Sequence, residues 1–144
     1  MNYWFCMLVI VLLIPVLVFG FGIHFSKGAP KNINQFFGFK TTRSMRSWDT
    51  WTFAHAKLGK LWKWTGLIMA VVSAGVFALA IKQSVDTISI YVILLMLAQT
   101  IALGVTVVLV EKALKKNFDD RGERTEASLA EEQQKAEKKA AAKK

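Results

Sequence analysis

The sequence has few of the side chains on which most catalytic and metal sites depend. Its 144 residues include one cysteine, Cys6, so an internal disulfide is impossible. The two histidines, His24 and His55, stand apart, and no cluster of His, Cys and carboxylates has metal-ligand spacing. No strand pattern is evident, and no glycine-rich phosphate loop follows one. We therefore expect no metal, no cofactor and no catalytic residue of a familiar kind.

Charge is absent from three long segments. Residues 3–23, 64–81 and 88–110 contain no Asp, Glu, Lys, Arg or His. A helix rises about 1.5 Å per residue and the bilayer core is about 30 Å thick, so such segments can cross a membrane. The second segment is short, and it can span the bilayer core if Leu61 and Trp62 extend it while the Lys63 side chain snorkels toward the headgroups. Coupled transport is disfavoured, because proton-coupled pumps and transporters usually need an ionisable group within their spans.

These segments predict an all-α integral membrane protein. A three-helix membrane domain covers residues 1–110, with spans at about 3–23, 61–81 and 88–110 and a loop at 24–60. Residues 111–144 are rich in Ala, Glu and Lys, and we expect a charged tail that is helical and fades to disorder.

The charges lie unevenly along the chain. Residues 24–63 carry eight Lys or Arg and one acid, Asp49, whereas the link 82–87 carries one Lys and one Asp. The positive-inside rule places the loop and tail in the cytoplasm and the N-terminus outside. Because topology explains the basic loop, we expect no nucleic-acid partner, and membrane lipids with anionic headgroups are the expected contact. The oligomeric state stays open.

The second span has an ordered helical lead-in. Ser47 is a candidate N-cap, and Asp49 complements the helix dipole in the first turn. One face of the lead-in has residues at intervals of 3, 4, 3 and 4, namely Trp48, Trp51, His55, Leu58 and Trp62. This pattern predicts a cytoplasmic interfacial helix whose aromatic face dips into the headgroups.

Small and polar residues within the spans predict how the helices pack. Two stripes with a spacing of four predict an antiparallel hairpin of the second and third spans: Gly66, Ala70, Ala74 and Ala78, and Ala98, Ala102 and Thr106. Pro15 should kink the first span. Gln99 and Thr100 are the most polar residues near mid-membrane, and we expect them to form interhelical hydrogen bonds.

The loop carries a distinctive run of spaced residues. It reads Asn34, Gln35, Phe36, Phe37, Gly38, Phe39, Lys40, Thr41, Thr42, Arg43, Ser44 and Met45, followed by Trp51, Ala54, His55, Gly59, Lys60 and Leu61. Over about residues 34–66 this pattern resembles the SdpI family, the immunity proteins of the sporulation-delay toxin system. Lys40 stands where that family usually has Arg, so a point charge replaces a planar bidentate donor.

The resemblance implies a membrane immunity-type protein that resists a membrane-active peptide toxin by binding through its cytoplasmic loop. The candidate ligand- or partner-binding residues are Asn34, Gly38, Lys40, Thr41, Arg43, Ser44, Trp51, His55, Gly59 and Lys60.

Three other roles stay open. The donors Lys40, Thr41, Arg43, Ser44 and Arg46 suit a protein that binds, or acts on, an anionic lipid or a lipid-linked phosphate. The tail suits a scaffold that recruits a soluble regulatory protein. The loop residues could also serve only to pin the loop to the membrane surface.

Overall fold

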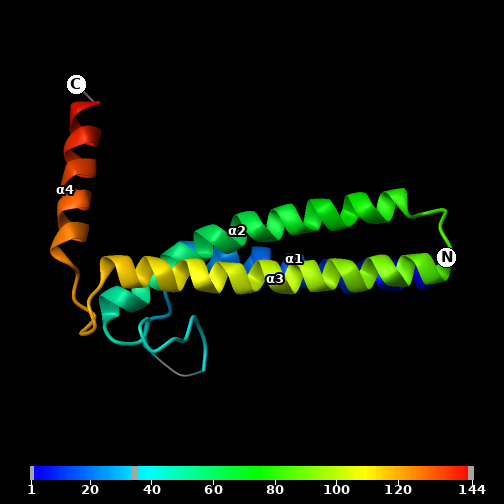
Figure 1. The fold of residues 1–144 in the computed structure, drawn as a ribbon, viewed down its shortest axis with the longest axis horizontal. Helices are drawn as coiled ribbons and strands as arrows, with labels where there is room; N and C mark the ends of the chain where they lie inside the picture. The colour runs from blue at the N-terminus through cyan, green and yellow to red at the C-terminus, as the bar shows by residue number, and fades with distance from the viewer. Residues whose placement is uncertain (1, 34–35, 143–144) are drawn as a thin grey trace.

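The computed structural model describes residues 2–33 and 36–142. Its helices are α1 (Asn2–Lys27), α2 (Trp48–Leu79), α3 (Val85–Asn117) and α4 (Glu126–Ala141). Helices α1, α2 and α3 form an elongated bundle, and α4 projects across its axis at one end (Figure 1). We call that end, which carries loop 28–47, the loop end; the opposite end, with residues 80–84, is the link end.

The first three helices are long and apolar enough to cross a membrane, which confirms the predicted all-α membrane fold. The described residues hold no strand beyond one isolated bridge between Phe118 and Arg124. Helices of 32 and 33 residues, α2 and α3, are each about 48 Å long, well beyond the bilayer core. The excess of both helices lies at the loop end, because Lys63 and Glu111 are the charges that bound their apolar parts on that side.

Helices α1 and α2 approach each other backbone to backbone at three glycines. A Cβ on Gly22 would lie 2.3 Å from the Lys63 nitrogen, and one on Gly59 would lie 2.5 Å from the Ser26 nitrogen. A Cβ on Gly66 would lie 2.6 Å from the Phe19 nitrogen. Within a bilayer, helices associate through such close van der Waals contact rather than through the hydrophobic effect. The α1–α2 pair is therefore the tightest interface of the bundle.

The prediction that α2 and α3 pack through their small-residue stripes is wrong about which helix faces meet. Gly66 packs against α1, and Ala74, Ala78 and Ala98 are exposed. The buried side of α2 instead carries Gly66, Met69, Ser73 and Phe77, at spacings of three and four. Four residues exceed one turn of 3.6 residues, so a stripe with a spacing of four drifts around the helix, from the buried side at Gly66 to the exposed side at Ala78.

We expect Gly66→Ala to destabilise the bundle by about 1–3 kcal/mol, because the new methyl group meets backbone atoms of α1 and must push the helices apart. Thermal unfolding in detergent micelles, followed by circular dichroism, measures the change. Gly75→Ala is the matched control: nothing lies within 4 Å of its added Cβ, and alanine favours the helix by up to about 1 kcal/mol. Equal unfolding temperatures for the two variants would contradict the glycine contact.

A single polar side chain joins all three spans near mid-membrane. Pro15 is buried in α1 and has no N–H, so the carbonyl of Val11 loses its partner within the helix. The Gln99 Nε2 group of α3 donates to that carbonyl at 3.2 Å and to Ser73 Oγ of α2 at 3.0 Å. The interhelical bond predicted for Gln99 is thus confirmed, and it satisfies the acceptor that proline exposes. The expectation for Thr100 is wrong, because its hydroxyl donates to Met96 within α3.

A double-mutant cycle tests this link. Gln99→Leu should cost about 1 kcal/mol more in the native chain than in the Pro15→Ala background, where the alanine N–H serves the Val11 carbonyl. A cycle is needed because Gln99 Oε1 is itself buried with no hydrogen-bond partner in the described part of the chain, so a single variant mixes two effects. The free energy of unfolding of the four proteins gives the coupling. If the effects of the two substitutions on the free energy of unfolding simply add, Gln99 does not satisfy the carbonyl that Pro15 leaves without a partner.

Candidate functional site

His55 of α2 binds the signature loop through one ring nitrogen and its own helix through the other. The backbone N–H of Phe39 donates to His55 Nε2 at 2.9 Å, and Nδ1 lies 2.7 Å from the Trp51 carbonyl oxygen. Since Nε2 accepts, the proton resides on Nδ1 and the ring is neutral. His55 is fully buried, and its two polar atoms are committed. It therefore shapes the loop and cannot itself touch a ligand.

Gly38 makes this contact sterically possible. Its φ is +119°, a backbone conformation that side chains rarely adopt. An added Cβ would lie 2.5 Å from His55 Nε2 and 3.0 Å from the Trp51 ring. Trp51 is also buried, and its Nε1 donates to the Pro30 carbonyl at 3.0 Å. We call Gly38, Phe39, Trp51 and His55 the histidine lock.

The aromatic face predicted to dip into the headgroups is therefore turned inward over most of its length. Trp51, His55 and Leu58 are buried against α1 and the loop, while Trp48 remains exposed. The predicted start of the helix is confirmed, because Ser47 is the N-cap and forms a capping box with Thr50. Helix α2 then continues without a break into the apolar segment.

The hydroxyl groups proposed for an anion site are used inside the loop. Ser44 Oγ donates to the Phe39 carbonyl at 2.7 Å and accepts the Thr41 N–H at 2.9 Å. The Ser44 N–H in turn donates to Thr41 Oγ1 at 3.2 Å. Ser44 is completely buried. These bonds close the turn 41–44 and leave the lysine and arginine side chains as the outward-facing donors.

The remaining predicted site residues fall into two groups. Gly59 is buried against α1, whereas Lys40 and Lys60 are exposed. Arg43 is partly buried and pairs with Asp120, with 3.4 Å between Nη1 and Oδ1. Asn34 lies outside the described residues. The ten predicted residues thus include buried residues that fix the conformation of the loop and a few outward-facing cations.

The chain after α3 returns to the loop, a contact that the sequence did not predict. Phe118 is buried and its ring meets that of Phe53, with centroids 5.3 Å apart. Ser47 Oγ donates to the Gly122 carbonyl at 2.8 Å. Gly122 has φ +85°, and the run Asp119, Asp120, Arg121 and Gly122 was the available sequence signal for a tight turn.

Asp119 organises this turn. Its carboxylate accepts the backbone N–H groups of Glu123 and Arg121 at 2.8 and 2.9 Å. These bonds, led by the one from Glu123, hold the pKa of Asp119 below its ordinary value. Residues 111–117 continue α3 and 126–141 form α4, so within the predicted tail the first part is integrated into the loop end.

An aromatic groove opens beside the histidine lock. Its volume is about 400 Å³. Residues from all three spans and the loop line it, namely Phe21, Phe25, Phe36, Phe37, Gly38, Phe39, Lys40, Thr41, Leu58, Trp62 and Val107. Sequence spacing identified the loop members but missed Phe21 and Val107, which are distant in the chain.

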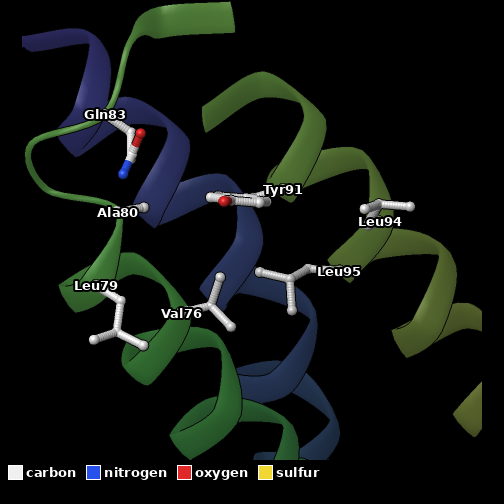
Figure 2. Close-up of a pocket in the computed structure, with 7 residues that line it drawn as sticks. All are labelled: Val76, Leu79, Ala80, Gln83, Tyr91, Leu94 and Leu95. Carbon is white, nitrogen blue, oxygen red and sulfur yellow. The ribbon is translucent and has the colours of Figure 1, made fainter. Parts of the chain in front are cut away.

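A second groove lies at the link end, where α2 and α3 diverge (Figure 1). Its volume is about 540 Å³, and Figure 2 shows Val76 of α2 and Leu95 of α3 pointing toward each other across it. The Tyr91 ring and the Gln83 amide supply the polar atoms among mostly aliphatic side chains. No described group of three or more His, Cys, Asp or Glu residues could hold a metal at either end.

Residues 31–110, more than half of the chain, match the model of the SdpI/YfhL protein family. The chain belongs to this family. The match covers the signature loop, α2 and most of α3, so the histidine lock lies within the part that defines an SdpI/YfhL protein. No curated protein and no solved structure gives a significant match.

Because of the histidine lock, we predict that the Phe39 amide is protected from hydrogen exchange. In His55→Ala the Phe39 N–H loses its acceptor, and we expect its hydrogen exchange to accelerate at least tenfold, because an unsatisfied buried donor costs about 1–3 kcal/mol. Exchange measured by mass spectrometry on peptides spanning residues 36–45 reports the change. Lys57→Ala, an exposed position on the same helix, is the control and should leave the exchange rate unaltered. Unchanged protection in His55→Ala would refute the lock.

Proposed function

We propose that this SdpI/YfhL protein is an immunity-type protein of the bacterial plasma membrane, which resists a membrane-active peptide toxin by binding through its loop end. The observation that carries the proposal is the histidine lock, which holds the signature loop in one conformation at the end of the spans. A loop fixed before binding loses little conformational entropy when a partner arrives. Family membership supports the same function.

The outward-facing surface of the loop end has the composition that an amphipathic peptide requires. Phe36 and Phe37 are exposed aromatic side chains, and Lys40 and Lys60 are exposed cations. Aromatic and basic side chains together bind a peptide that has an apolar face and an anionic or carboxylate group. The buried members of the predicted site, Gly38 and His55 among them, hold this surface in shape.

The orientation of the protein is part of the proposal. The basic residues of 24–63 lie at the loop end, and the positive-inside rule puts that end in the cytoplasm with the N-terminus outside. A toxin that acts on the membrane would then meet the loop after crossing or entering the bilayer.

Membrane potential in a sensitive bacterium tests the function. Cells that express the protein are challenged with a panel of depolarising peptides, and the half-depolarising concentration is measured. We expect native protein to raise it, His55→Ala to abolish the protection, and Lys40→Ala to reduce it about five- to thirtyfold, the usual cost of removing an important contact. Lys82→Ala, at the link end, is the matched control. Depolarisation as fast as in empty cells with every peptide would overturn the immunity proposal.

Two further variants locate the contact. Leu95→Trp fills the link-end groove and should leave protection intact if the loop end binds the peptide. Loss of protection in this variant, with Lys40→Ala still protective, would move the binding site to the link end. A chain that ends after Thr125 lacks α4 but keeps the turn that packs on the loop. Its protection should equal that of the full chain, whereas loss would favour a scaffold that recruits a soluble partner through α4.

A further inference from the structure

The aromatic groove runs from the apolar part of the bundle to the charged loop. Phe21 of α1 and Val107 of α3 line its membrane side, and both belong to the apolar segments of their helices. Lys40 and Thr41 also line it, where the charged loop enters the turn that Ser44 closes. The groove therefore crosses the boundary between hydrocarbon and headgroups, where a bound molecule needs an apolar part and a polar part.

The charge around the groove favours an anion at its polar end. Residues 24–63 carry eight cations and a single acid, Asp49. The segment after α3 brings Asp120 to Arg43 at 3.4 Å, but neither of these two residues lines the groove. Asp49 is exposed in the first turn of α2 and does not line the groove. Each lysine near a membrane surface attracts anionic lipid with about 1 kcal/mol. The polar part of the occupant is thus an anionic group such as a phosphodiester.

The size of the groove decides what the apolar part is. One turn of an α-helix with a diameter of about 10 Å and a pitch of 5.4 Å occupies about 420 Å³, so a groove of about 400 Å³ would hold a single turn of peptide. The rings that line it also contact one another, with the Phe37 centroid 5.7 Å from Phe25 and 6.0 Å from Phe21. Rings in contact leave no slot between them and form one continuous aromatic wall. A flexible chain can lie along this wall within about 400 Å³, whereas a helix longer than one turn cannot fit.

We propose that the aromatic groove binds one anionic phospholipid of the adjoining leaflet, with an acyl chain against the phenylalanine rings and the phosphate beside Lys40. This lipid is a resident of the loop end and does not depend on the proposed immunity function. It would fill the space between the loop and the spans and so complete the surface that carries Phe37.

Native mass spectrometry of the full chain tests the acyl-chain site. The protein is extracted from bilayers of phosphatidylglycerol and phosphatidylcholine in equal amounts, and the retained lipids are counted. We expect one retained phosphatidylglycerol in native protein and at least a fivefold loss in Val107→Trp, whose indole occupies the groove. Val108→Trp is the matched control, because the neighbouring residue is exposed on α3 and does not line the groove. Equal retention by the two variants, high or low, would overturn the site.

Lys40→Gln tests the headgroup contact without altering the groove walls. We expect its preference for phosphatidylglycerol over phosphatidylcholine to fall about fivefold, the effect of one lysine near anionic lipid. Lys82→Gln, at the link end, should retain the native preference. An unchanged preference in Lys40→Gln, or equal retention of the two lipids by native protein, would overturn the anionic occupant. These measurements use no toxin, so their failure would leave the immunity proposal standing.

Discussion

The structure depends on the backbone contact between α1 and α2. A bilayer offers no hydrophobic force to drive two apolar helices together, so their association needs surfaces that approach closely. Gly22, Gly59 and Gly66 provide such a surface over the half of α2 nearest the loop. Because the loop 28–47 connects these same two helices, their contact fixes both ends of the loop. The histidine lock then needs only a few hydrogen bonds to hold the connection in one conformation.

The third helix is held by polar atoms at intervals. Trp62 Nε1 donates to Thr106 Oγ1 at 2.9 Å near the loop end, Gln99 binds α1 and α2 in the middle, and Tyr3 OH lies 2.6 Å from Ser89 Oγ near the link end. Helices α2 and α3 diverge from each other toward the link end (Figure 1). The loop end is thus the part of the bundle where glycine packing and hydrogen bonds coincide.

The sequence predicted the larger features because they follow from composition. Charge-free segments gave the three spans, and Ser47 gave the start of α2. It failed where a pattern changes sides along one helix. The small residues of α2 at a spacing of four begin on the buried side at Gly66, which meets α1, and end on the exposed side at Ala78. Whether a helix face meets lipid or protein depends on partners that spacing does not specify.

The candidate site shows the same division. The resemblance named Gly38, Trp51 and His55 as candidate binding residues, and the structure shows that they contact one another. It could not show that Ser44 and Thr41 satisfy each other, because donors of a short turn point inward or outward according to backbone angles. Nor could it bring Phe118 or Val107 to the loop, since contacts between distant segments leave no periodic trace.

The position of Phe118 has a consequence for biosynthesis. This residue fills the apolar cluster beneath the loop together with Phe25, Phe39 and Leu58, which are made much earlier. At about 5–20 residues per second, the ribosome reaches it several seconds after the loop has emerged. During that interval the first two helices must remain in the membrane with an incomplete cluster exposed at their end. Membrane insertion and the final closure of the loop end are therefore separate events, and the second occurs only when the third helix has been inserted.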